Sequence, residues 1–179
     1  MGISVLPQAI RGASLVPAGF IVERVTRTRN GIEIAVHASR KAGTCPGCGT
    51  ISRRVHSRYH RQVADLPLSG QSVRVIVAAR RFRCDAVRCG TQIFTERFPA
   101  DVLPRSARRT ARLEGIVHHL GLALGGRPAA SFARRLMVPV SNDTLLRVVR
   151  RPGPADAAAG DRHRRLGLAP QPPLRNPGL

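Results

Sequence analysis

Four cysteines are the residues of this sequence whose types and spacing most clearly indicate chemistry. Cys45 and Cys48 stand in T-C-P-G-C-G, and Cys84 and Cys89 stand in R-C-D-A-V-R-C-G, so a long insert separates two close pairs. Such pairs can supply the four thiolates of one tetrahedral zinc ion. Because four thiolates leave no open coordination position, the spacing predicts one structural zinc (Zn2+) per chain and not a catalytic one.

Two alternatives to this site stay open. The cysteines could be reduced and buried without a metal, but that arrangement would not require the turn formed by Pro46 and Gly47. His56 or His60 could replace a cysteine, but both lie in a basic, strand-like stretch where a phosphate-facing role is expected. The second pair is also spaced more loosely than the usual two-residue gap.

The excess of positive charge indicates the class of molecule that the chain binds. The chain carries 30 Lys and Arg against 10 Asp and Glu, which gives a formal net charge of +20. Such an imbalance repels itself unless a polyanion neutralises it, so nucleic acid is expected. Every basic residue except Lys41 is an arginine, which suits bidentate contacts to phosphates and guanine edges. A GC-rich genome would explain arginine in place of lysine, but not the scarcity of acids.

The N-terminus is too short and interrupted for a signal peptide, and no apolar run reaches membrane-spanning length. We therefore expect a cytoplasmic, nucleoid-associated protein with no membrane partner. In a reducing compartment, paired cysteines favour metal over disulfides.

Strand patterns surround the cysteines. Residues 20–37 contain two stretches rich in β-branched residues around Asn30 and Gly31, a pair that fits a tight turn, so a hairpin is predicted. A second strand ends at Cys84. The residues expected to alternate onto one face are Ile32, Ile34 and Val36 in the hairpin and Val73, Val75 and Val77 in the later strand. Short strands that join two cysteine turns are typical of a zinc ribbon.

After Phe98 the pattern becomes helical. A first helix should end at Gly125 and Gly126, a second should follow Pro128, and Ser141 should cap a third. A longer helix followed by two short ones around a tight turn is typical of a helix-turn-helix. The residues expected to face inward are Leu113, Ile116, Val117, Leu120 and Leu124, then Phe132, Ala133 and Leu136, then Leu145, Leu146 and Val149.

The fold class expected is α+β, a β-rich zinc ribbon followed by an all-α helix-turn-helix and a disordered, proline-rich tail. The boundaries expected are a lead segment at 1–19, the hairpin and ribbon at 20–99, the helix-turn-helix at 100–151 and the tail at 152–179.

DNA contacts are expected from two regions. Basic runs around the ribbon should contact phosphates; the alternative is a solvated charged face. The third helix should supply base contacts; the alternative is an ordinary three-helix bundle. The residues are Arg53, Arg54, Arg58, Arg61, Arg80, Arg81 and Arg83 near the ribbon, and Asn142, Thr144, Arg147, Arg150 and Arg151 in the helix. The acids are scattered singly, so the residues indicate no catalytic set.

Residues 20–151 contain, in order, the motifs C-P-G-C-G, H-S-R-Y-H-R-Q-V-A-D-L-P, R-R-F-R-C-D-A-V-R-C-G-T-Q-I-F-T-E-R-F-P, L-G-L-A-L-G-G-R-P-A-A-S-F-A-R-R-L and V-P-V-S-N-D-T-L-L-R-V-V-R-R. Together these motifs resemble the N-terminal half of the ISL-three family of insertion-sequence transposases. The resemblance implies that the four cysteines bind zinc and that both regions recognise terminal inverted repeats in double-stranded DNA. It also implies a following RNase H-like catalytic domain with three carboxylates.

The sequence departs from the family after Arg151, where a proline-rich tail stands in place of the strand with the first catalytic aspartate. We therefore expect a non-catalytic, truncated fragment. With suitable codons, residues 165–177 can be an out-of-frame translation of D-W-A-W-R-R-S-R-R-Y-G-T, which the other reading frames of the gene would test.

Three other interpretations stay open. The chain could be a stand-alone zinc-ribbon and helix-turn-helix transcription regulator, or part of an enzyme that assembles with a separately encoded catalytic half. It could also be the product of a pseudogene. A homodimer stays open as a further partner.

Overall fold

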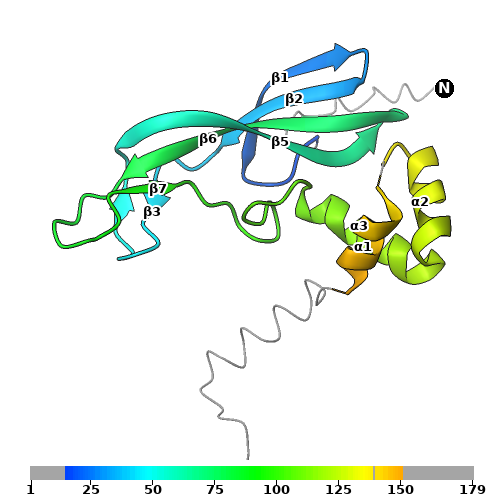
Figure 1. Cartoon of the computed structure of the whole chain (residues 1–179). Coiled ribbons are helices and arrows are strands. Elements are labelled where there is room, and N and C mark those ends of the chain that lie inside the picture. Colours follow the sequence, from blue (N-terminus) through cyan, green and yellow to red (C-terminus); the bar gives the residue numbers. More distant parts are fainter. Residues whose placement is uncertain (1–14, 139, 151–179) are drawn as a thin grey trace, which may run out of the picture.

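A computed structural model describes residues 15–138 and 140–150 of the chain (Figure 1). Residues 1–14 of the expected lead segment, Arg151 and the expected tail at 152–179 lie outside the described residues. Strands come first along the chain and three helices follow, so the part that the structure describes is β-rich with a helical end. This agrees with the α+β class predicted from the sequence.

The first hairpin joins β1 (Phe20–Thr28) to β2 (Gly31–Ala38). The two strands pair antiparallel from Phe20↔Ala38 to Thr28↔Gly31, which confirms the predicted hairpin. Gly31 has φ 127°, a value that residues with a Cβ rarely adopt, so glycine is required at this turn. Ile34 and Val36 are buried on one face of β2, as their alternation predicted.

A longer hairpin forms the centre of the sheet. Strand β5 (Val55–Leu68) pairs antiparallel with β6 (Gln71–Arg83), and β2 pairs parallel with β6. The strand order is β1-β2-β6-β5, and the short strand β7 (Ile93–Thr95) also pairs with β6. Strand β6 therefore joins the first hairpin to the second cysteine pair.

One face of this sheet is packed and the other is open. Val73, Val75 and Val77 alternate onto the packed face, as predicted, and their side chains are at most 5% exposed. Leu103 covers them from the segment between β7 and α1, and Val16 and Phe20 pack at the same core. Burying each such side chain contributes about 1.5–3 kcal/mol, so this core is large enough to stabilise the sheet without a metal.

Three helices form what we call the helical unit: α1 (Ala111–Leu124), α2 (Gly126–Arg135) and α3 (Asn142–Val149). Thr110 caps α1, because its side-chain oxygen accepts from the backbone N–H of Leu113. Ser141 caps α3 in the same way through Thr144, as the sequence predicted. Within the described residues, no helix is long and apolar enough to cross a membrane.

The predicted inward faces of these helices are only partly right. Leu113, Val117, Ala133 and Leu145 are buried and Leu120 packs against them, whereas six other positions differ. In α2 the small residues Ala129, Ala130 and Ala133 are the buried ones, and the larger Phe132, and Leu136 directly after the helix, are exposed. In α1 and α3, Val148 is buried and Val149 is half-buried; the other exposed residues are Ile116, Leu124 and Leu146.

A buried polar network connects the helical unit to the sheet. The carboxylate of Asp65 in β5 is fully buried, and it accepts hydrogen bonds from the Thr110 hydroxyl at 2.6 Å and from Nε of Arg112 at 2.8 Å. Nη2 of Arg112 donates to Asp65 at 2.6 Å and to the Leu15 carbonyl at 2.8 Å. Leu66 also packs against the helical core. The end of β5 is thus fixed to the start of α1.

Close packing of α1 on α3 predicts opposite effects at two glycines of α1. A Cβ at Gly121 would lie 2.6 Å from Cγ2 of Val149, whereas a Cβ at Gly115 would meet nothing within 4 Å. Gly121→Ala should lower the free energy of unfolding by about 1–3 kcal/mol through overpacking. Gly115→Ala, the matched control, should raise it by about 0.5–1 kcal/mol. Urea unfolding measures both, and equal effects would contradict the packing.

Candidate metal centre and nucleic-acid interface

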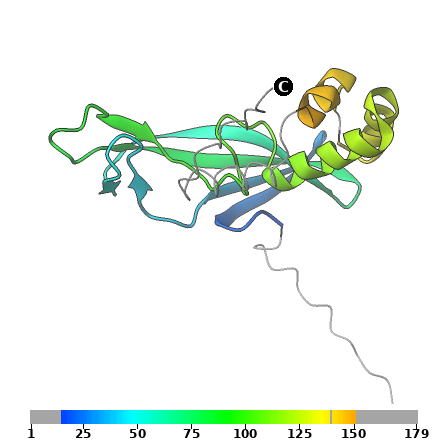
Figure 2. The same cartoon turned by 90° about the horizontal axis from the view of Figure 1, so that it is seen from below.

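The four cysteines come from two turns at one end of the sheet. The first pair lies in the turn between β3 (Gly43–Thr44) and β4 (Ile51–Ser52), which pair antiparallel. Cys84 follows the end of β6, and Cys89 lies in the loop before β7. We call β3, β4, β7 and the two cysteine turns the ribbon. In both views it lies at the opposite end of the molecule from the helices (Figure 1 and Figure 2).

The thiols converge on one point. All four sulfur atoms lie within 4.8 Å of one another, with 3.8 Å between Sγ of Cys45 and Cys89 and 3.5 Å between Sγ of Cys48 and Cys84. A tetrahedron of thiolates around zinc, with bonds of about 2.3 Å, has sulfur atoms separated by about 3.8 Å. No disulfide joins these cysteines. The spacing therefore fits a four-thiolate structural zinc site.

Backbone hydrogen bonds shape each cysteine turn. In the first, the Gly49 N–H donates to the Cys45 carbonyl at 2.9 Å, and Gly49 itself has φ 76°. In the second, the Thr91 N–H donates to Sγ of Cys89 at 3.4 Å. Such a donor stabilises negative charge on a thiolate and orients it toward the metal.

The two turns also pack directly on each other. A Cβ at Gly47 would lie 2.7 Å from Oγ1 of Thr91, so only glycine fits this contact without displacing its neighbour.

Two phenylalanines form the apolar core on which the ribbon packs. Phe82 is fully buried, Phe94 is 4% exposed, and their rings stack with centroids 5.7 Å apart. They form a small core with Cys45, separate from the core of the sheet. A Cβ at Gly43 would lie 2.7 Å from the Phe82 ring, so the backbone of β3 rests on that ring. This pair has no periodic signature in the sequence, although both residues flank the second cysteine turn.

Two thiols of the cluster, Cys48 and Cys84, have shifted pKa values. Hydrogen bonds from the side chain and then the backbone of Thr50 lower the pKa of Cys48 to about 6. The Ala86 backbone lowers the pKa of Cys84, but burial and the neighbouring thiols outweigh it and raise that pKa to about 12. Thiolates in such proximity cannot all ionise unless a cation compensates their charge, and Zn2+ supplies that compensation.

The histidine alternatives receive no support from the geometry. Among the described residues, the metal-capable cluster comprises the four cysteines and no histidine. His56 and His60 are exposed on β5, where their side chains share a face with Arg58. The ligand set is therefore the one predicted from the sequence: Cys45, Cys48, Cys84 and Cys89.

Ion pairs engage most of the acidic side chains that the structure describes. The acidic side chains of Asp65 and Glu96 are buried, and those of the other pairs lie at the surface. The pairs are Glu23–His37, Asp85–Arg54, Glu33–Arg74, Glu96–Arg80, Glu114–Arg109 and Asp65–Arg112. The remaining exposed arginines therefore dominate the surface potential, and a polyanion is the partner that this surface favours.

Of the arginines predicted near the ribbon, three make internal contacts. Arg80 is 17% exposed and donates to Glu96, both from Nε at 3.1 Å and from Nη2 at 2.5 Å. Arg61 donates from Nη2 to the Ala107 carbonyl at 3.0 Å, and Arg54 pairs with Asp85 at 3.0 Å. Arg80 thus holds β7 against β6, a structural role. The other four, Arg53, Arg58, Arg81 and Arg83, are exposed, and Arg54 is exposed too despite its pair with Asp85.

Helix α3 presents its predicted contact residues unequally. Arg147 and Arg150 are exposed, whereas Asn142 and Thr144 are half-buried. Oδ1 of Asn142 lies 1.9 Å from where a Cβ at Gly126 would stand, and Thr144 shares a 2.9 Å hydrogen bond with Ser141. The two polar residues therefore contact the protein itself, and the arginines are the side chains most available to DNA.

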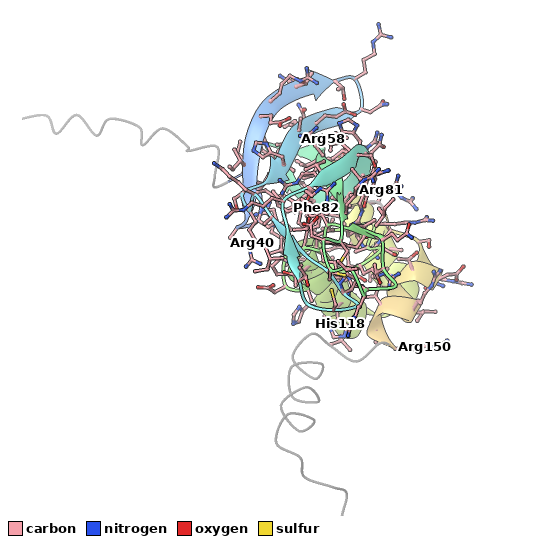
Figure 3. The ribbon with its side chains drawn as sticks, turned by 90° about the vertical axis from the view of Figure 1, so that its left-hand side faces the viewer. Arg40, Arg58, Arg81, Phe82, His118 and Arg150 are labelled. Carbon is pink, nitrogen blue, oxygen red and sulfur yellow. The ribbon has the colours of Figure 1, made fainter. Side chains whose placement is uncertain are left out.

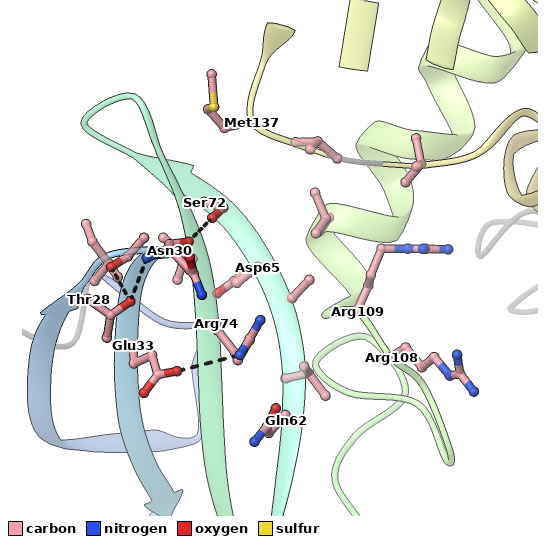
Figure 4. A pocket seen from close by; sticks show the side chains of 18 residues that line it. Thr28, Asn30, Glu33, Gln62, Asp65, Ser72, Arg74, Arg108, Arg109 and Met137 are labelled. Atoms are coloured by element: carbon pink, nitrogen blue, oxygen red, sulfur yellow. Dashed lines mark hydrogen bonds and ion pairs between the residues drawn. The ribbon is translucent and has the colours of Figure 1, made fainter. Parts of the chain in front are cut away.

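Figure 4 shows a hollow of about 440 Å³ between the tip of the first hairpin and the helical unit. Three arginines line it, and two of them are paired, Arg74 with Glu33 at 3.6 Å and Arg109 with Glu114 at 2.6 Å, while the third, Arg108, is exposed. Its charge is therefore largely compensated within the protein, and we assign no ligand to it.

Comparison with known protein families gives a match to the cysteine region. Residues 41–89 match the zinc-finger family of the transposases IS204, IS1001, IS1096 and IS1165. The matched segment contains all four cysteines of the cluster. The chain has no significant match among curated proteins or among solved structures.

Proposed function

Because residues 41–89 are the zinc-finger region of an ISL-three family transposase, we propose that this chain recognises the terminal inverted repeats of an insertion sequence in double-stranded DNA. The observation that carries this proposal is the coincidence of the matched segment with four converging thiols. The excess of exposed arginines supports it, because counterion release from phosphates drives protein–DNA association.

The residues next to the ribbon supply phosphate contacts in this proposal. Arg53, Arg58, Arg81 and Arg83 are exposed on or beside the strands that lead to the cysteine turns. The positions of Arg53 and Arg83 depend on the zinc, because Arg53 follows β4 and Arg83 precedes Cys84, whereas Arg58 and Arg81 are placed by the main sheet. The role of the metal in this proposal is structural, because it fixes the two cysteine turns. Arg80 holds β7 next to them through its ion pair with Glu96.

The helical unit acts as a helix-turn-helix in this proposal. Helices α2 and α3 are joined by a short turn in which Met137 has φ 58°, the left-handed conformation that glycine more often supplies. Helix α3 would enter the major groove and present Arg147 and Arg150, since arginine pairs bidentately with guanine edges. Its α1 partner is held to the sheet by Asp65, so both contact regions keep a fixed separation.

In this proposal the assigned residues bind DNA, and none of them is given a role in cutting it. Strand transfer with two metal ions needs clustered carboxylates, and the described acidic side chains lie apart, most of them in ion pairs with Arg or His. We therefore assign these residues to the non-catalytic, DNA-binding part of transposition.

A binding titration tests the proposal. The protein should bind a duplex that carries the inverted-repeat ends of the adjacent element more tightly than a scrambled duplex, by about 10³-fold or more. Arg147→Gln should reduce that preference, because it removes a base contact worth about 1–3 kcal/mol. Arg134→Gln, an exposed arginine of α2, is the matched control. Equal affinity for both duplexes would contradict inverted-repeat recognition.

A further inference from the structure

A second hollow, of about 420 Å³, lies where β5 and β7 meet the segment that leads to α1. We call it the linker hollow. Side chains from β5, from the residues after β7 and from the loop before α1 line it. They include Tyr59, Arg61, Arg97, Arg105 and Ser106. Neither Arg97 nor Arg105 was singled out in the sequence, because each stands alone in a segment without a regular pattern.

The charge of the linker hollow is uncompensated. Arg97 and Arg105 are exposed, and Arg61 is half-buried beside them. Glu96 also lines the hollow, but its side chain is 4% exposed and is held by the guanidinium of Arg80. No acid among the lining residues therefore offers a competing carboxylate, in contrast to the hollow of Figure 4.

The walls of this hollow are rigid. Leu103 is 1% exposed, and its N–H donates to the Pro99 carbonyl at 2.9 Å. Phe98 packs on Phe20 with ring centroids 5.1 Å apart. Arg61 holds the loop through the Ala107 carbonyl at 3.0 Å. Because these contacts order the backbone of the loop before any ligand arrives, the entropy lost on binding an anion would be mainly that of the two arginine side chains.

Its position connects the two proposed contact regions. In Figure 1 the ribbon, the segment after β7 and the helices follow one another along the lower side of the sheet. At the hollow, the guanidinium of Arg81 lies 5.0 Å from the centre of the Tyr59 ring. Figure 3 shows Arg81 and Arg150 toward the same side of the molecule and Arg40 toward the opposite side.

We propose that the linker hollow binds a phosphodiester group of the DNA backbone, held by Arg97 and Arg105, between the phosphate contacts next to the ribbon and the base contacts of α3. This inference rests on the proposed DNA-binding function and deepens it. Arginine forks match phosphate oxygens bidentately, and a preformed site for one backbone group would set the register of the protein along the duplex. The ligand is thus a backbone phosphate, independent of base sequence.

The salt dependence of DNA affinity tests this site. A short fluorescein-labelled duplex is titrated with the full chain, carrying its zinc, over a series of salt concentrations. Each of Arg97→Gln and Arg105→Gln should weaken binding by about tenfold and make the log–log slope less steep by about 0.9, because each removes a phosphate contact. Both should weaken specific and scrambled duplexes equally. Arg40→Gln is the matched control, with the same charge change on the opposite side.

The outcomes separate the two proposals. Wild-type binding that falls steeply with salt, with a smaller slope for Arg97→Gln and Arg105→Gln than for Arg40→Gln, supports the site. Steep wild-type binding with the same slope for all three variants overturns this inference and leaves the proposed function standing. A wild-type protein that shows no salt-dependent binding overturns both. Thermal unfolding of each variant checks that these exposed positions leave the fold intact.

Discussion

A Cys48→Ser variant is expected to lose its zinc and to unfold the ribbon while the sheet and the helical unit stay folded. Binding of a structural zinc is worth about 10–16 kcal/mol in zinc-finger peptides, whereas burial of Phe82 and Phe94 contributes only about 3–6 kcal/mol. The metal term is the larger one, so the aromatic pair cannot hold the two turns without it. The core around Val75 is separate from the core around Cys45, and it should survive.

Two-dimensional amide NMR distinguishes the parts of the chain in this variant. Signals of residues 43–52 and 84–95 should move to positions typical of unfolded chain, while those of β6 before Phe82 and of α1 should be retained. Ile51→Ser is the matched control, because it also introduces a serine into the ribbon, at a side chain that is 68% exposed. A zinc-free Cys48→Ser protein with native ribbon signals would refute the metal's structural role.

Loss of Arg112 is expected to have the second largest effect, because it leaves the Asp65 carboxylate buried with too few partners. Asp65 is fully buried and Arg112 is 32% exposed, and two of the hydrogen bonds to Asp65 come from that guanidinium. Removal of one partner of a buried ion pair costs about 3–5 kcal/mol. Arg112→Met should therefore lower the free energy of unfolding by about 3 kcal/mol, as measured by urea denaturation at neutral pH.

The matched control for this variant is Arg108→Met, which changes an exposed arginine of the same segment. It should alter stability by no more than about 0.5 kcal/mol. Adding Asp65→Asn to Arg112→Met should restore part of the loss, since no unpaired charge then stays buried and the Thr110 hydroxyl keeps an acceptor. If Arg112→Met and Arg108→Met unfold at the same urea concentration, the pair does not hold the helical unit to the sheet.

The metal ligands and the local elements could be predicted from the sequence, because the information lies close together in the chain. Cys45 and Cys48 are joined by a turn that Pro46 and Gly47 favour, and the hairpin around Asn30 follows from one dipeptide. Alternating valines identified β6 and its buried face for the same reason. Each of these features has a short-range signature that one stretch of residues carries.

Long-range contacts could not be predicted in this way. The parallel pairing of β2 with β6 joins strands that are far apart in sequence, and neither strand shows it in its own pattern. Phe132 and Leu136 have the spacing of an inward face, yet the alanines of α2 take that place. The network of Asp65 with Arg112 likewise joins two residues whose types are common at any surface.

The zinc content of the purified protein tests the central claim most directly. Elemental analysis of the full chain, purified without added metal or chelator, should give about one zinc per chain. Titration with a thiol reagent should then release that zinc as the four cysteines react. A metal-free protein whose ribbon shows native NMR signals would contradict the claim that a four-thiolate zinc holds this part of the DNA-binding surface together.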